Sequence, residues 1–294
     1  MNQFLERYKQ LGQEFNPEDV KIKNALRINT LKSNEKEVIN RLNAKLTKIS
    51  FLKNGYYYES EFSMAATPEH LQGYYYLQEA ASQLPAEILE PKGTDTVLDM
   101  CASPGSKTTQ LAMLMNNKGK ITALDSENVR LPKLQNNLER CGVTNTITYK
   151  KDARYAQDLG LEFEKILLDA PCSGNFAIEP DWFLERKLGD IKALVKTQRQ
   201  LLQAAIDVLK PGGILVYSTC SLEPEENELN INWLLNEYKD VELEKIDIDI
   251  GDPGLTKAFD RELNPDLAKC KRFWPHKTGT QGFFLAKLRK LKNL

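Results

Sequence analysis

The sequence contains no run of 18 or more consecutive apolar residues, so we expect neither a membrane-spanning helix nor a membrane partner. Its first ten residues, MNQFLERYKQ, lack the apolar core of a signal peptide. The cysteines form no CxxC pair, and their odd number argues against a disulfide framework. They lie at positions 101, 141, 172, 220 and 270. With only two histidines, we predict a cytoplasmic protein that has reduced thiols and no metal site.

Two common nucleotide-binding loops are missing as well. The segment CASPGSKT (101–108) follows an apolar run, but it lacks both the Gly-Lys pair of a P-loop and the GxGxxG pattern. It still predicts a tight turn from a strand into a helix. Backbone N–H groups in such a turn can meet a negatively charged group, for example a carboxylate.

The net charge of −1 hides an uneven distribution. Residues 1–60 carry +4, and residues 269–294 carry eight basic residues and no acidic one. The intervening residues, 61–268, carry −13. Basic ends on an acidic middle favour a polyanion held at the ends, although solvated lysines without a partner would give the same pattern.

The first part of the chain reads as a small mixed α/β module. Residues 2–12 have apolar side chains at helical spacing, and ALRINT (25–30) is typical of a short strand. Asn34, with Glu37 three residues later, predicts a capped helix that continues to about Leu46. Residues 77–93 predict a further helix, which ends at Pro91 and Gly93.

From residue 96 onward, apolar strands alternate with helical segments. Strands are expected at 96–102, 120–125, 146–153, 165–170 and 214–220, and a long helix at 191–210. This alternation predicts an α/β fold with a mainly parallel, doubly wound sheet. We expect a small N-terminal α/β module in residues 1–72 and one larger domain in residues 73–294.

In such sheets, ligands bind outside the carboxyl ends of the strands. The second strand ends in Asp125, and the third carries Asp152. Asp169 and Cys172 follow the fourth strand, and Cys220 follows the fifth. An acid at the end of the second strand suits ribose hydroxyls, although a helix cap would also explain Asp125. A buried cysteine is usually just a small apolar residue, but two thiols on one edge weaken that explanation.

The motifs DMCASPGSKTTQL, DAPCSG and STCSLEPEENE together resemble the RNA 5-methylcytosine methyltransferase family, also called the NOL/NOP/Sun family. LQEAASQLPAEIL, RFWPHKTGTQGFFLAKL and ALRINT extend the resemblance over most of the chain. Ser103 and Ser106 stand where the family commonly has Ala and Gly. The resemblance implies a Rossmann-like methyltransferase fold, with a catalytic domain in residues 73–294 that uses S-adenosylmethionine. It also implies methylation of carbon 5 of cytosine in RNA.

The resemblance gives each cysteine a different role. Carbon 5 of cytosine is a poor nucleophile until a thiolate has added to carbon 6. The resemblance assigns that addition to Cys220 and the later release to Cys172. Asp169 would hold the N3 edge of the base, and Lys107 would give electrostatic support, although a solvated lysine at a helix start is an equal alternative.

The resemblance also implies a cofactor site. Asp125 would bind the ribose and Asp152 the adenine amino side, whereas Arg130 could equally be an ordinary surface arginine. The complete set is Cys101, Ala102, Ser103, Pro104, Gly105, Ser106, Lys107, Asp125, Arg130, Asp152 and Asp169.

The compact chain looks most like archaeal-type transfer-RNA enzymes, so tRNA is favoured over rRNA, and a monomer is expected. The N-terminal module and the basic C-terminal segment are expected to hold phosphates. Ribosomal RNA as the substrate is one alternative. Another is a DNA cytosine methyltransferase, in which Cys172 of the Pro-Cys pair would attack. A catalytically silent RNA-binding protein is a third.

Overall fold

A nine-stranded sheet forms the centre of the protein. The computed structural model describes residues 2–292. The strand order is β11-β14-β15-β9-β8-β5-β6-β7, and β10 also pairs with β15. The parallel strands are β5 (Thr96–Asp99), β6 (Lys120–Asp125), β7 (Thr146–Lys150), β8 (Phe163–Asp169) and β9 (Leu209–Thr219). The mainly parallel α/β fold predicted from the sequence is therefore confirmed.

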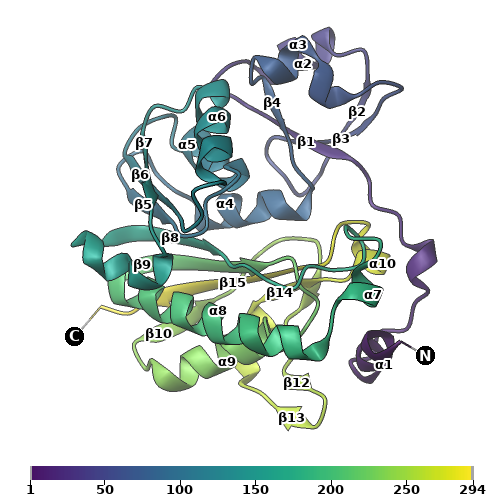
Figure 1. Ribbon diagram of the computed structural model, residues 1–294, viewed down its shortest axis with the longest axis vertical. Coiled ribbons are helices and arrows are strands. Elements are labelled where there is room, and N and C mark those ends of the chain that lie inside the picture. Colours follow the sequence, from purple (N-terminus) through teal and green to yellow (C-terminus); the bar gives the residue numbers. More distant parts are fainter. Residues whose placement is uncertain (1, 293–294) are drawn as a thin grey trace.

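Helices cover both faces of this sheet (Figure 1). α4 (Leu84–Leu89) and α5 (Ser106–Leu114) lie on one face, and α8 (Leu188–Val208) and α9 (Glu228–Glu237) lie on the other. α6 (Leu131–Cys141) packs beside α5. Successive residues of a strand point to opposite faces, so Leu167 packs with the first layer and Leu168 with the second. This alternation explains why the strands read as continuous apolar runs.

The antiparallel strands come from the last part of the chain. They are β10 (Val241–Glu244), β11 (Asp252–Pro253), β14 (Lys271–Phe273) and β15 (Phe283–Lys290). A small separate hairpin consists of β12 (Lys257–Ala258) and β13 (Arg261–Glu262). Two short helices complete the larger part of the protein: α7 (Trp182–Glu185), which precedes α8, and α10 (Pro275–Thr278), which lies between β14 and β15. β15 pairs with β9 on one side and with β14 and β10 on the other, so it is an internal strand.

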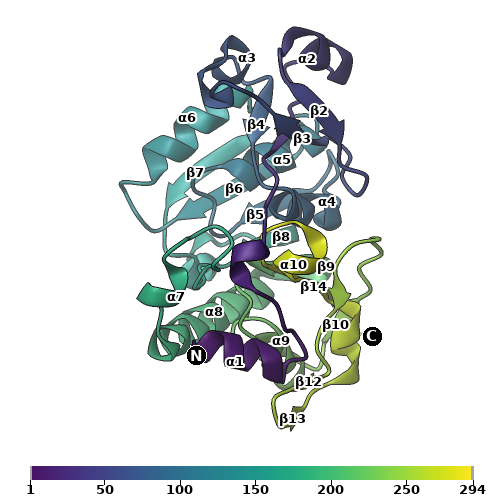
Figure 2. The same ribbon diagram turned by 90° about the vertical axis from the view of Figure 1, so that its right-hand side faces the viewer.

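A second, four-stranded antiparallel sheet forms the N-terminal module, in the order β2-β3-β1-β4. Its elements are β1 (Ala25–Ile28), α2 (Glu35–Arg41), β2 (Lys45–Lys48), β3 (Gly55–Glu59), α3 (Pro68–Leu71) and β4 (Tyr75–Leu77). The first helix, α1 (Gln3–Gln10), precedes this module in the sequence but does not pack on it. It packs instead on the domain that contains the nine-stranded sheet (Figure 2).

Two expected helices need correction. The Asn34 side chain accepts the expected cap bond from the N–H of Glu37 at 2.9 Å, but the helix ends at Arg41 rather than near Leu46. Residues 45–48 instead pair with β3. Likewise, the helix expected over 77–93 begins only at Leu84, because residues 75–77 pair with β1.

No helix within residues 2–292 is long and apolar enough to cross a membrane.

Candidate active site

The two cysteines that follow β8 and β9 face each other. Their Sγ atoms lie 3.1 Å apart, although 48 residues separate them in the sequence. β8 and β9 are parallel neighbours, with Asp169 opposite Ser218, so the loops after them leave the sheet side by side. Contact with the Cys220 sulfur, together with burial, raises the pKa of Cys172 and favours its protonated thiol. The structure thus brings the predicted thiols together.

Beside the thiols, Asp169 forms an ion pair with Lys107. The Lys107 Nζ atom lies 2.6 Å from Asp169 Oδ2, and the Ser218 hydroxyl donates to Oδ1 at 2.7 Å. The lysine side chain is 10% exposed, so it is held against the carboxylate rather than solvated. The alternative of a freely solvated lysine at the helix start is therefore wrong.

Asp125 closes β6 and is almost fully buried. Its Oδ2 accepts a bond from the N–H of Ser103 at 3.2 Å, and Oδ1 accepts one from the N–H of Glu127 at 3.0 Å. Arg130 lies nearby, with its Nε atom 3.7 Å from Asp125 Oδ2. Arg130 also donates to the Ser103 carbonyl at 2.8 Å, so it is tied to the loop that follows β5.

The loop from Cys101 to Lys107 makes the expected sharp turn into α5. Gly105 precedes the helix with a φ of +104°, which an L-residue rarely adopts. A Cβ atom at Gly105 would lie 3.1 Å from the Leu134 side chain, so this turn also packs closely against α6. The other loop residues are Cys101, Ala102, Ser103, Pro104 and Ser106, and all but the exposed Pro104 are at least partly buried.

Asp152 has its hydrogen-bond donors close by in the sequence, in Arg154 two residues later. Its carboxylate accepts hydrogen bonds from Nε and Nη2 of Arg154, the latter at 2.6 Å, and from the backbone N–H of Arg154. The hydrogen bond from the arginine side chain lowers the pKa of Asp152.

Asp99 is a site residue that the sequence reasoning missed. It lies at the end of β5 and is 1% exposed, and its Oδ2 accepts the Thr108 hydroxyl at 2.7 Å. Among residues 2–292, its Oδ1 has no hydrogen-bond partner. Burial raises the pKa of Asp99 to about 6. Its position at the end of the first parallel strand was the only signal in the sequence that could have identified it.

Within residues 2–292, no group of three or more His, Cys, Asp or Glu side chains is arranged to hold a metal ion.

This combination of a doubly wound sheet and acids at the ends of its strands defines the Rossmann-like methyltransferase class. A family model described as 16S rRNA methyltransferase RsmB/F matches residues 86–289. A model of the N-terminal domain of 16S rRNA methyltransferase RsmF matches residues 1–80. The chain belongs to the RsmB/F methyltransferase family, and the resemblance drawn from its motifs is confirmed.

Named relatives act on different RNAs. A tRNA (cytosine(72)-C(5))-methyltransferase of Pyrococcus horikoshii is 45% identical over 223 residues, which cover 76% of this chain and 54% of that protein. A human 28S rRNA (cytosine(4447)-C(5))-methyltransferase is 39% identical over 279 residues, which cover 91% of this chain and 34% of that protein. The chain thus spans about half or less of the length of these two relatives.

Solved structures from Pyrococcus horikoshii match nearly the whole chain. A methyltransferase homolog protein is 40% identical with a TM-score of 0.85, and the match covers 97% of this chain and 90% of that one. NSun6, solved with SFG, is 31% identical with a TM-score of 0.83, and the match covers 94% and 93% of the two chains.

Proposed function

We propose that this protein methylates carbon 5 of cytosine in RNA and uses S-adenosylmethionine as the methyl donor. The observation that carries the proposal is the pair of thiols 3.1 Å apart, beside the ion pair of Asp169 and Lys107. A single attacking cysteine would suffice to activate carbon 5, so a second thiol at contact distance favours a reaction whose covalent bond must also be broken.

In this mechanism, the Cys220 thiolate adds to carbon 6 and makes carbon 5 nucleophilic. Asp169 holds the N3 edge of the base, and Lys107 keeps that carboxylate in place. Cys172 assists the release as its thiolate: it takes the carbon-5 proton, the electrons of that C–H bond form the double bond between carbons 5 and 6, and the bond between carbon 6 and the Cys220 sulfur breaks to return the Cys220 thiolate. Its raised pKa makes the Cys172 thiolate the stronger base for this proton. S-adenosylmethionine supplies the methyl group from its sulfonium.

The residues around β5 and β6 fit this cofactor. The buried carboxylate of Asp125 suits ribose hydroxyls, and the unpartnered oxygen of Asp99 offers a further acceptor at the same edge. We assign the loop from Cys101 to Lys107, together with Asp125, Arg130, Asp152 and Asp169, to the cofactor site. The NSun6 neighbour was solved with SFG, an analogue of S-adenosylmethionine, which supports this assignment.

For the substrate, we favour tRNA over rRNA. The relative with a tRNA name is 45% identical, whereas the relative with a 28S rRNA name is 39% identical. We further propose a cytoplasmic monomer in which the N-terminal module contacts RNA and the larger domain catalyses the reaction. The bounds proposed from the sequence are 1–72 and 73–294, and β4 (Tyr75–Leu77) adds the last strand of the module's sheet just beyond residue 72. Sequencing methylated cytosines in RNA from cells with and without the gene identifies the RNA. Methylation lost only from rRNA would contradict the preference for tRNA.

The covalent step has a direct test on a denaturing gel. Cys220→Ala should form no adduct with RNA and transfer no methyl group. Cys172→Ala should still attack and methylate, and then accumulate a protein–RNA adduct that survives denaturation. The double variant should form none, because the adduct depends on Cys220.

The same gel distinguishes the alternatives. A DNA cytosine methyltransferase in which Cys172 attacks would leave Cys172→Ala inert and without an adduct. A silent RNA-binding protein would form no adduct in any variant. An adduct formed by Cys220→Ala would overturn the assignment of the nucleophile.

A further inference from the structure

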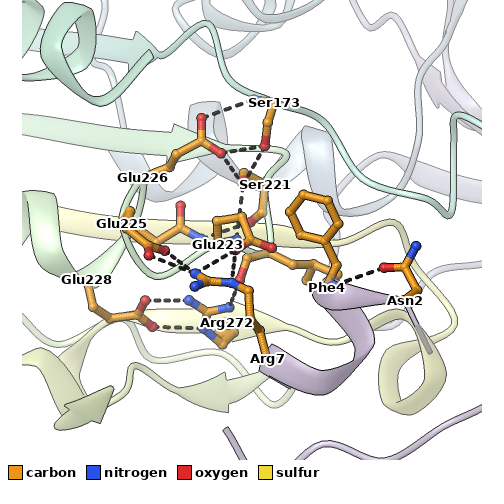
Figure 3. A network of polar contacts seen from close by, with 12 residues as sticks. Asn2, Phe4, Arg7, Ser173, Ser221, Glu223, Glu225, Glu226, Glu228 and Arg272 are labelled. Atoms are coloured by element: carbon orange, nitrogen blue, oxygen red, sulfur yellow. Dashed lines mark hydrogen bonds and ion pairs between the residues drawn. The ribbon is translucent and has the colours of Figure 1, made fainter. Parts of the chain in front are cut away.

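Each of the two facing cysteines is followed by a serine, and both serines reach the same carboxylate. The hydroxyls of Ser173 and Ser221 donate to Oε2 of Glu226 (Figure 3). The two hydroxyl oxygens also lie 3.1 Å from each other, the same separation as the two sulfur atoms. One carboxylate thus connects the loop after β8 with the loop after β9.

Glu226 is fully buried, and its carboxylate is fixed by further donors. Its Oε1 accepts the N–H of Ser173 at 3.0 Å and the side-chain amide of Gln198 at 2.8 Å. Gln198 also donates to the Pro171 carbonyl at 2.9 Å, directly before Cys172. The Glu226 carbonyl accepts the hydroxyl of Tyr217, on β9, at 2.6 Å. The carboxylate is therefore held by α8, and the Glu226 backbone by β9, while the carboxylate connects the two cysteine loops.

Its neighbours in the sequence are stabilised differently. Glu223 and Glu225 pair with Arg7, and Glu228 pairs with Arg272 (Figure 3). Among the described residues, Glu226 forms no ion pair with a basic side chain. A buried carboxylate without a cation is costly, so its four neutral donors carry the whole compensation. Two of the four are the serine hydroxyls beside the thiols.

We propose that Glu226 is a positioning residue that holds Cys172 and Cys220 at a fixed separation through Ser173 and Ser221. The positioning role itself does not depend on the proposed function. Only its purpose does, which is to keep Cys172 next to the bond that Cys220 forms with the RNA base. Asn175 adds a second connection between the loops, because its side-chain amide donates to the Cys220 carbonyl at 2.8 Å.

The charge of Glu226 also favours the protonated thiol of Cys172. Contact with Cys220 and burial are the main reasons why the pKa of Cys172 is raised, and the nearby Glu226 carboxylate adds to the same effect. Glu226→Gln would remove this contribution. The NH2 group of the glutamine would also replace one accepting oxygen, so donors that now bind that oxygen would lose their acceptor.

The alignment can be tested without RNA. In glutathione disulfide, Cys172 and Cys220 can form an internal disulfide while two glutathione thiols are released. A displaced thiol instead retains one glutathione as a mixed disulfide. Mass spectrometry of the two cysteine peptides measures the ratio of internal to mixed disulfide. We expect Glu226→Gln to lower this ratio at least tenfold, and Ser173→Ala or Ser221→Ala to lower it less.

Glu228→Gln is the matched control, because it removes a buried carboxylate of the same segment that contacts neither serine. Its ratio should stay within about twofold of the wild type. An unchanged ratio in Glu226→Gln, or an equal drop in Glu228→Gln, would overturn the proposal. The single-serine variants keep the test valid if Glu226→Gln fails to fold.

A second measurement connects the alignment to the reaction. With RNA and cofactor, Glu226→Gln should slow covalent attack and release tenfold or more while RNA affinity stays the same, and Glu226→Asp should restore part of the rate. Weakened RNA binding with unchanged covalent rates would contradict a positioning role. If the disulfide ratio changes as expected but no variant, including wild type, forms an RNA adduct, the proposed function fails while the positioning role stands.

Discussion

The two basic ends of the chain look alike in the sequence but differ in the structure. All Lys and Arg side chains between residues 21 and 53 are exposed except that of Arg27. Among the Lys and Arg residues of 269–292, only Lys277 and Lys292 are exposed, and Arg272 is fully buried. The difference teaches that an excess of basic residues in the sequence indicates an RNA-binding surface only where the fold leaves their side chains exposed to solvent.

The C-terminal charges have protein partners. Lys287 pairs with Glu90 at 3.0 Å, and Arg289 pairs with Glu244. Lys290 donates to the carbonyl of Ile206 at 2.8 Å. We therefore propose that these three side chains stabilise the sheet, in place of the expected contact with RNA phosphates. Phe273 and Trp274 of the same segment are buried as well.

Each end also buries one arginine, and the two are compensated differently. Arg272 faces the carboxylate of Glu228 and donates to the Leu222 carbonyl at 2.6 Å. Arg27 reaches only neutral acceptors among the described residues, including the Ser106 carbonyl at 2.9 Å and the Thr109 hydroxyl at 2.8 Å. Burial lowers the pKa of Arg27 to about 10.

The largest effect is expected for the buried ion pair. Arg272→Met should lower the free energy of unfolding by about 3–5 kcal/mol, because Glu228 would remain buried and charged without its partner. Urea denaturation measures the loss. Adding Glu228→Leu should recover most of it, because an apolar pair replaces the ion pair. A single variant within about 1 kcal/mol of the wild type would be inconsistent with this account.

A smaller loss is expected at the other end. Arg27→Met should lower the free energy of unfolding by about 2–4 kcal/mol, because neutral acceptors in the core lose their donor but no charge is left behind. The same urea experiment measures it. The exposed control Lys21→Met should stay within about 0.5 kcal/mol of wild type. A larger loss than that of Arg272→Met would reverse the order proposed for the two arginines.

The smallest effect on stability, and the largest on RNA, is expected for the exposed N-terminal lysines. Replacing Lys21, Lys23, Lys36 and Lys53 by Gln should flatten the slope of log affinity against log salt by about 0.7–0.9 for each phosphate that is no longer neutralised. Titrations of labelled tRNA at several salt concentrations measure this slope. The matched set Lys287, Arg289, Lys290 and Lys292, replaced by Gln, should change stability more than the slope. The opposite result would restore the C-terminal segment as the RNA-binding surface.

Local signals predicted much of the fold. The parallel strands followed from apolar runs, and their carboxyl ends identified Asp169, Cys172 and Cys220 as neighbours. The end of α2 was not predictable from its cap, because pairing of residues 45–48 with β3 decides it. The sequence reasoning judged β15 by its charge, although residues 283–286 form a buried apolar run and the strand is paired on both sides.

The supporting residues of the site were harder to foresee. Glu226 lies in an acidic segment, EPEEN, in which neighbouring carboxylates look equivalent in sequence. Only the positions of Ser173 and Gln198, which are distant in sequence, distinguish it from Glu223 and Glu225. The role of Arg27 was equally hidden, because most of its acceptors lie on α5, about 80 residues later in the sequence.

The internal position of β15 also constrains how the protein forms during synthesis. β9 has no partner on that side until residues 283–290 have left the ribosome. Arg7 binds Glu223, which lies 216 positions later in the sequence. At about 5–20 residues per second, roughly 10–40 s pass between them. The apolar face of α1, with Phe4 and Tyr8, packs against Trp182, Ile191 and Trp274, so its native surface is complete only after these distant segments have been translated.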